Sequence, residues 1–218
     1  MDLDNAVVAG GMGTDASAQQ FAVVVVNPSP SSATVGVWVS DAAPGSAAAE
    51  RLVDEAVVDT NGSHVFDLER REVDGSSADG ANDGSHTAWT ANAYRIRSTA
   101  PVVVYQFNPL QSVDTFSTDA SLLIPTSSLG SVYTALGWPQ TVANTPDPDT
   151  DLGTDLRAFL AIVGSEPGTR VRVTLAADIV PLPEPPPGAE AARAGETLEI
   201  VPGPTRCSTS RPAGSTAT

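Results

Sequence analysis

Residues 93–125 read AYRIRSTAPVVVYQFNPLQSVDTFSTDASLLIP, and this stretch decides the fold class. Val102 to Phe107 is a short apolar run, rich in β-branched and aromatic residues and bounded by prolines, which predicts a buried, central β-strand. Ala93 to Arg97 alternates between faces and predicts a half-buried strand. Ala120 to Ile124 is a third short apolar run that ends at a proline. Three such strands predict a sheet around which the rest of the chain is organised.

The composition sets the size of the core and excludes two classes of partner. At 218 residues with 41% hydrophobic content, the chain suffices for one large all-β domain or two small ones. The net charge of -15 argues against nucleic acid and anionic membrane as partners, because both would be repelled. No run of about 18 apolar residues is present, so we predict no membrane insertion by this chain.

The first part of the chain carries strand signals separated by turn residues. Phe21 to Asn27 and Ala33 to Ser40 are predicted to form a hairpin over a loop of about five residues. Residues 47–56 fit either a helix or an irregular connection; the all-β surroundings favour an irregular connection followed by a strand at 55–58. Ser63 to Leu68 follows an Asn-Gly turn and is predicted to be a strand.

The second part of the chain predicts further strands. Ser131 to Trp138 is one, and Leu156 to Gly164 is predicted to pair with Thr169 to Leu175 around the turn SEPG. Val180 to Gly188 is a proline-rich connector, and Thr197 to Val201 is predicted as the last strand. The predicted fold class is therefore all-β, an antiparallel β-sandwich with irregular acidic and proline-rich loops. Whether it is one sandwich or two packed sub-sandwiches stays open.

Three segments resemble a known family. They are PVVVYQFNPL at 101–110, FSTDASLLIP at 116–125 and SLGSVYTALGWPQT at 128–141. Together they resemble the domain family named after the N-terminal region of the IgGFc-binding protein, found in bacterial surface proteins and in an animal mucus protein. The similarity spans most of the chain, from about Asp2 to Val201, and departs from the family at position 118, where Thr stands in place of an expected Asn.

The resemblance implies a function and a location. It implies a non-catalytic, extracellular or cell-surface module for protein binding or adhesion, with binding of the immunoglobulin Fc region as the family's nominal activity. The alternative is a carbohydrate-binding domain or an accessory domain of a secreted hydrolase. The expected partner is a protein or glycan at the cell surface, and no cofactor is expected. The start, MDLDNAVVAGG, is not a signal peptide, so the resemblance implies a fragment of a larger exported protein.

The chain is predicted to divide into three regions. Residues 1–19 form a flexible lead-in or a truncated strand. Residues 20–201 form the β domain, with a candidate internal boundary in the acidic loop 73–88. Residues 202–218 lack periodicity and are predicted to be a disordered tail. From Gly203 onward a neighbouring reading frame can encode GPYEVLNLETRRLDGD, which resembles the family's continuation, so a frameshift product is the alternative to an ordinary low-complexity tail.

Catalytic signals are weak. The two histidines, His64 and His86, lie in a predicted strand and a predicted loop. The sequence has no Gly-x-Ser-x-Gly elbow and no His-Glu-x-x-His pair. The run Gly10-Gly11-Met12-Gly13 lacks the spacing of a phosphate-binding loop. We therefore predict that the chain is not an enzyme.

The best metal candidates are three alternating carboxylates. Asp147, Asp149 and Asp151 place hard oxygen ligands at alternating positions, as a calcium loop requires. The register departs from an EF-hand, because Leu152 stands where that loop needs Gly and Ala158 where it needs Glu. A solvated acidic loop is the favoured interpretation, so no metal is predicted.

Aromatic residues offer the remaining binding candidates. Trp38 and Trp138 lie on predicted strands and are expected in the core. Trp89 lies near a polar loop and is the binding candidate, although the ligand is not identified by the sequence. Gln106 and Asn108 interrupt an apolar run, and their amides are predicted to satisfy backbone groups.

Overall fold

The computed structural model shows a protein built from antiparallel strands. It describes residues 20–44, 46, 48–73, 75, 87–111, 118–137, 160–166, 169–182 and 184–200, and the backbone of 206–210. The strands are β1 (Phe21–Val26), β2 (Ala33–Ser40), β3 (Glu50–Val58), β4 (Ser63–Leu68), β5 (Thr87–Thr90), β6 (Arg95–Ser98), β7 (Val103–Asn108), β8 (Asp119–Leu122), β9 (Leu160–Gly164), β10 (Val171–Thr174), β11 (Thr197–Ile200) and β12 (Arg206–Ser210). Within these residues the only helical element is the 3₁₀ turn η2 (Thr126–Ser128), which confirms the predicted all-β class.

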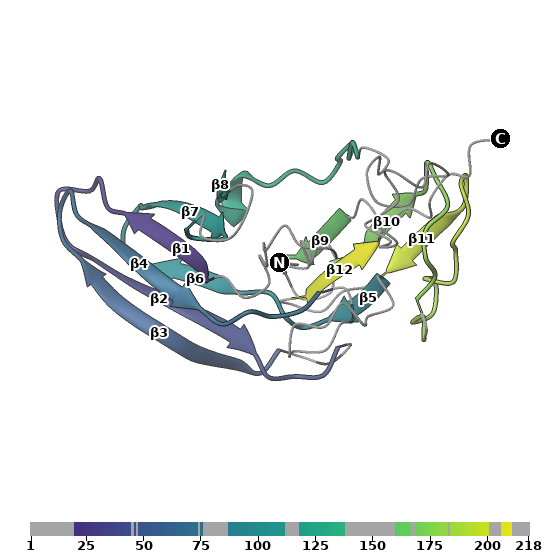
Figure 1. Cartoon of the computed structure of the whole chain (residues 1–218), viewed down its shortest axis with the longest axis horizontal. Helices are drawn as coiled ribbons and strands as arrows, with labels where there is room; N and C mark the ends of the chain where they lie inside the picture. The colour runs from purple at the N-terminus through teal and green to yellow at the C-terminus, as the bar shows by residue number, and fades with distance from the viewer. Residues whose placement is uncertain are drawn as a thin grey trace, which may run out of the picture.

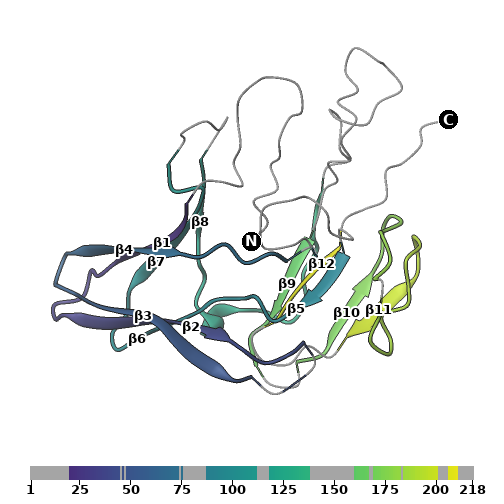
Figure 2. The same ribbon diagram turned by 60° about the horizontal axis from the view of Figure 1, so that its bottom comes forward.

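Two sheets enclose the larger core, and we call them the first sheet pair. One sheet has the strand order β4-β1-β7-β8, and the other has the order β3-β2-β6. Figures 1 and 2 show these strands grouped at the left, with β5 and β9 to β12 at the right. We call the two sheets at the right, β5-β12-β9 and β10-β11, the second sheet pair.

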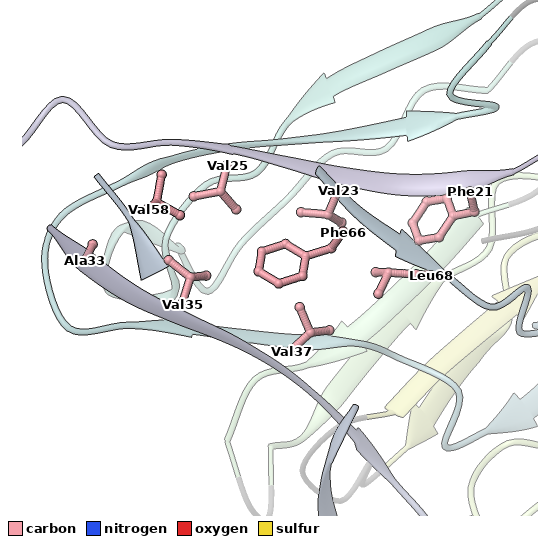
Figure 3. Packing of buried hydrophobic residues seen from close by; sticks show 9 residues of the cluster. All are labelled: Phe21, Val23, Val25, Ala33, Val35, Val37, Val58, Phe66 and Leu68. Atoms are coloured by element: carbon pink, nitrogen blue, oxygen red, sulfur yellow. The ribbon is translucent and has the colours of Figure 1, made fainter. Parts of the chain in front are cut away.

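The core of the first sheet pair is formed by alternate residues of facing strands (Figure 3). Because successive side chains of a strand point to opposite faces, a run such as FAVVVV places every second residue inside. Full burial of a Val, Leu or Phe side chain contributes about 1.5–3 kcal/mol. The buried residues are Phe21, Val23, Val25, Ala33, Val35, Val37, Val58, Phe66 and Leu68.

The predicted hairpin of β1 and β2 is wrong, because the two strands lie in different sheets. β1 pairs with β4 and β7, whereas β2 pairs with β3 and β6. Asn27 stabilises the loop in which the chain passes from β1 in one sheet to β2 in the other. Its buried Nδ2 donates hydrogen bonds to the carbonyls of Ser31 and Val58, both at 2.9 Å, and its Oδ1 accepts one from the Ser29 N–H. The valines of β1 and β2 therefore meet across the core.

Only one of the three strands predicted to be central has neighbours on both sides. This strand is β7, which lies between β1 and β8, whereas β6 and β8 are edge strands of the described sheets. No residue of β7 is fully buried, and Tyr105 is 38% exposed. The prediction of a buried strand is therefore wrong, because only the inner face of β7 meets the core.

Strand β3 is longer than predicted and carries an ion-pair network. It begins at Glu50, so residues 50–56 are strand and the helix alternative is wrong. The Glu50 carboxylate lies 2.8 Å from Arg95 and 2.7 Å from Arg97, two residues of β6 on the far side of β2. Burial raises the pKa of Glu50, but the hydrogen bonds from the two arginines outweigh burial and hold this pKa below its ordinary value of 4.5. The network therefore links all three strands of this sheet.

The second sheet pair has a smaller core. It consists of Leu175, Ala189, Leu198 and Ile200, with Trp89 of β5 packed against it. The predicted pairing of β9 with β10 around SEPG is wrong, because β9 pairs with β12 and β10 pairs with β11. Both pairings join segments that lie far apart in the sequence.

The remaining predictions fall at the two ends of the chain and in two loops. The structure differs from the predicted disordered tail at Arg206–Ser210, which form β12 between β5 and β9, so β11 is not the last strand. The predicted strand at 131–138 is wrong for residues 131–137, which form no strand. Residues 1–19, Trp138 and most of the loop 73–88 lie outside the described residues. The frameshift alternative stays a prediction.

Candidate functional site

The outer face of the β4-β1-β7-β8 sheet carries a row of apolar side chains. The strand register places Val65 opposite Val24, Val24 opposite Tyr105, and Tyr105 opposite Leu122. Residues opposite one another share a face, and the neighbours of Val24 on β1 point into the core, so this row points outward. Val65, Tyr105 and Leu122 are 44%, 38% and 55% exposed. We call these four residues the outer apolar row.

The apolar character continues beyond β8 into residues 123–137, which we call the exposed segment. In Figure 1 this segment leaves β8 and runs toward the second group of strands. Apart from the turn η2 it has no regular structure. Its large apolar side chains are open to solvent, which is unusual because monomeric proteins seldom expose large contiguous apolar patches. They are Ile124 62%, Leu129 44%, Val132 89%, Tyr133 69% and Leu136 94% exposed.

The edge of β8 adds unpaired backbone groups. Among the described strands β8 pairs only with β7. The Leu123 N–H donates to the Val104 carbonyl at 2.8 Å. In an antiparallel ladder such bonds alternate along the strand, so the N–H and C=O groups of Ala120 and Leu122 point away from β7. An open edge of this kind can pair with an extended segment of another chain.

We call the combined surface the outer apolar surface. It comprises the outer apolar row, the exposed segment and the open edge of β8. Residues 118–137 contain one charged residue, Asp119, in a chain whose net charge is -15. A surface with so little charge cannot select its partner by electrostatic attraction. Its chemistry instead fits an extended apolar segment that gains backbone hydrogen bonds at the edge and buries side chains on the face.

Trp89, the predicted binding candidate, and Trp38, the predicted core residue, lie in different environments. Trp89 lines a pocket together with Arg71 and Asn92, so the binding candidate does lie at a concave site. Trp38 is partly exposed on the face of β2 opposite the core valines, with the Arg97 guanidinium 5.0 Å from its ring centre, so it is not a core residue as predicted. Trp138 lies outside the described residues.

The other predicted site residues form no constellation in the described structure. His64 is half-buried on β4, and its ring packs edge-on against Phe66 at 4.6 Å. His86 and the calcium candidates Asp147, Asp149 and Asp151 lie outside the described residues. Among the described residues, no group of three or more His, Cys, Asp or Glu could hold a metal ion. The same residues include no helix with the length and apolar character needed to cross a membrane.

Gln106 and Asn108 occupy the strand positions that the sequence predicts. Gln106 lies opposite Val23, on the inner face of its sheet. Asn108 is the last residue of β7 and lies opposite Asp119 of β8. Neither amide belongs to the outer apolar surface, and the prediction that they satisfy backbone groups stays a prediction.

Comparison with known proteins gives one family match, within the second half of the chain. The family model described as IgGFc binding protein matches residues 119–201. The predicted family is thereby confirmed over this range, and its predicted extent from about Asp2 stays a prediction. A search of curated proteins and a search of solved structures each gave no match. The family match suggests a protein-binding module of an extracellular or surface protein, from a family of binding domains rather than enzymes.

Sequence reasoning missed the outer apolar surface, although the matched range begins with β8 and the exposed segment. Apolar runs were assigned to the core, since this is where most such runs lie. One signal was available: residues 123–137 combine apolar side chains with Pro, Ser and Gly that interrupt a strand. The outward direction of Tyr105 and Leu122 becomes evident only from the strand register.

Proposed function

We propose that this protein is a non-catalytic extracellular or cell-surface β module that binds a protein partner, in adhesion or recognition, through its outer apolar surface. The observation that carries this proposal is the exposure of Val132, Tyr133 and Leu136, which are 89%, 69% and 94% exposed. Exposed apolar patches of this kind mark interaction sites. All three residues fall within the range matched by the family model.

The mode of binding follows from the edge of β8. An extended partner segment would add a strand beside Ala120 and Leu122, whose backbone groups point away from β7. Its outward-facing side chains would then continue the outer apolar row beyond Leu122. Aromatic anchors supply much of the binding energy at protein interfaces, and Tyr105 and Tyr133 are the aromatic residues of this surface.

The first probe is the purified Fc fragment of immunoglobulin G, because the family description names this ligand. We expect saturable binding in biolayer interferometry. The double variant Tyr133→Ser and Leu136→Ser should weaken it at least about tenfold, since loss of interface anchors costs about 1–2 kcal/mol or more. Both residues are mostly exposed, so the fold should be retained.

The control is Val57→Ser, which removes a 65% exposed apolar side chain from β3, in the other sheet of the first sheet pair. It should bind Fc like the parent protein. Fc binding that survives the double variant would place the interface elsewhere, and absence of Fc binding would remove immunoglobulin as the ligand. Sedimentation velocity of the protein alone completes the test. A dimer that the double variant dissociates would make a second copy, not a different protein, the partner of this surface.

A further inference from the structure

A pocket of about 400 Å³ lies at the end of β5, beside the end of β2. Its lining comes from three separate places in the chain: the end of β2 with the following loop, from Ser40 to Pro44, the segment after β4 at Arg71, and Trp89 to Asn92. Its volume falls within the range of about 300–1,000 Å³ that is typical of small-ligand sites. It shares no residue with the outer apolar surface.

Trp89 belongs to the pocket lining and is supported by the second sheet pair. Trp89 is partly exposed and packs against the core cluster of the second sheet pair, which contains Leu198 and Ile200. The side chain is therefore anchored by this core while it also lines the pocket. A fixed aromatic surface favours a ligand with a flat apolar face, because little side-chain entropy is lost on binding.

The polar groups of the pocket are held in place by hydrogen bonds. Arg71 Nη2 donates to Asn92 Oδ1 at 3.1 Å and to the Ser40 carbonyl at 3.4 Å. Asn92 Nδ2 donates in turn to the Glu72 carbonyl. The Arg71 guanidinium also lies 5.8 Å from the ring centre of Tyr94.

The pocket lining carries one charge of each sign. Arg71 supplies one positive charge and Asp41 one negative charge to the lining. Asp41 accepts hydrogen bonds from Arg51 Nε at 2.7 Å and from Arg51 Nη2 at 3.1 Å, so its carboxylate is already paired with a cation outside the lining. An anionic ligand would meet the Asp41 carboxylate, and a cationic ligand would meet Arg71 and Arg51. The lining therefore suits an uncharged ligand that is rich in hydrogen-bonding groups.

We propose that this pocket binds one unit of a neutral sugar. The apolar C–H face of the sugar ring would lie against Trp89, and its hydroxyl groups would bond to Arg71, Asn92 and Asp41. Planar amide, guanidinium and carboxylate groups can donate to or accept from neighbouring hydroxyls on a ring, whereas a purely apolar ligand would leave them unpaired. The inference does not rest on the proposed protein-binding function.

The test uses glucose, galactose, mannose and N-acetylglucosamine as neutral probes and glucuronate as the anionic probe, with the whole chain observed by saturation-transfer NMR titration. We expect at least one neutral sugar to bind with a dissociation constant in the millimolar range, typical of a single sugar unit and equivalent to about -4 kcal/mol. Glucuronate should bind more weakly than this sugar. Absence of binding by all four neutral sugars, or preferential binding of glucuronate, would overturn the proposal.

A blocking variant and a matched control locate the binding. Ala42→Phe adds a ring to a residue that lines the pocket, and Ala43→Phe adds the same ring to the exposed neighbouring residue outside the lining. Neither change removes a polar group of the pocket, and unfolding midpoints will verify that both variants fold. We expect Ala42→Phe to weaken sugar binding about tenfold or more and Ala43→Phe to change it less than about twofold. Equal binding by the two variants would contradict the proposal.

A final arm distinguishes a free sugar from a protein-linked glycan. Ribonuclease B carries a neutral high-mannose glycan, and ribonuclease A is the same polypeptide without it. Binding of ribonuclease B alone, lost in Ala42→Phe, supports the pocket as a site for protein-linked glycan. Binding of a monosaccharide with neither ribonuclease supports a site for a free sugar. Equal binding of both ribonucleases through the pocket would mean that it recognises polypeptide, which contradicts the proposal.

Discussion

The first and second sheet pairs are built from the same kind of strand but stabilised differently. In the first, all nine buried core residues lie on strands of two facing sheets. In the second, Leu198 and Ile200 lie on β11, whereas Leu175 and Ala189 lie in connecting segments. The first core is therefore specified by strand alternation alone, and the second also needs its connections to adopt particular turns.

Two features show how those connections are held. Gly188 has φ +90, a conformation that side chains with a Cβ rarely adopt, and an added Cβ would meet the Glu199 carbonyl oxygen. The Glu196 carboxylate accepts hydrogen bonds from the N–H groups of Ala192 and Arg193, at 2.8 and 2.9 Å. Where few strands contribute, a core can therefore be completed by residues of connecting segments that specific turns hold in place.

The largest expected effect tests the first core. Phe66→Ala removes a fully buried ring from between the two sheets, and Phe to Ala changes in cores cost about 3–5 kcal/mol. The free energy of unfolding, measured by urea denaturation, should fall by this amount. The control is Val65→Thr on the opposite face of the same strand, where the side chain is 44% exposed and the change should cost about 0.5 kcal/mol or less. Similar losses for the two variants would contradict the core assignment.

A smaller loss is expected in the second core. Leu198→Ala removes a side chain that is 5% exposed within a cluster of four buried residues. Because a small cluster next to loops can partly collapse around the gap, the loss should lie near the lower end of the usual range, about 2–3 kcal/mol. Thr174→Val, at an exposed position of the neighbouring strand β10, is the matched control. A Leu198→Ala loss equal to that of Phe66→Ala would remove the distinction between the two cores.

The smallest effect concerns the ion-pair network across β3, β2 and β6. The pKa of Glu50 is held below its ordinary value of 4.5, so the network's contribution is present above about pH 4.5 and is lost as the pH falls through the lowered pKa. Glu50→Gln should therefore reduce stability by about 1 kcal/mol or less at neutral pH and by nothing at the acid end of the titration. Unfolding midpoints across this pH range check the prediction, with Glu55→Gln on the same strand as the control. A pH-independent loss would show that the charge of Glu50 is not the cause.

Local sequence patterns predicted most strands but not their partners. Runs such as ATVGVWVS and SHVFDL became β2 and β4 because alternation is a local property. Pairing depends on long-range packing, so no local pattern predicts that residues 206–210 lie between β5 and β9. The β1–β2 prediction failed because a five-residue loop fits both a hairpin and a crossing between sheets, and the bonds of Asn27 decide for the crossing.

The candidate sites were predictable only in part. Trp89 is the binding candidate because its position near a polar loop predicts exposure, and it belongs to the pocket lining. Arg71 and Asn92 gave no signal, because they reach the pocket from segments separated in the chain by a long loop. The outward direction of Tyr105 and Leu122 is not predicted, because an apolar run does not reveal which of its faces is covered. Exposure is a property of the assembled sheets.

The open edge of β8 has a consequence for the behaviour of the protein in concentrated solution. Unpaired strand edges with apolar flanks promote aggregation through edge-to-edge contact. The net charge of -15 opposes such encounters by repulsion between molecules. At about 1 M salt the Debye length shrinks to about 3 Å, and this repulsion is screened. The tendency of the protein to aggregate should therefore depend on ionic strength. At low ionic strength, repulsion between the negatively charged molecules hinders contact between their β8 edges.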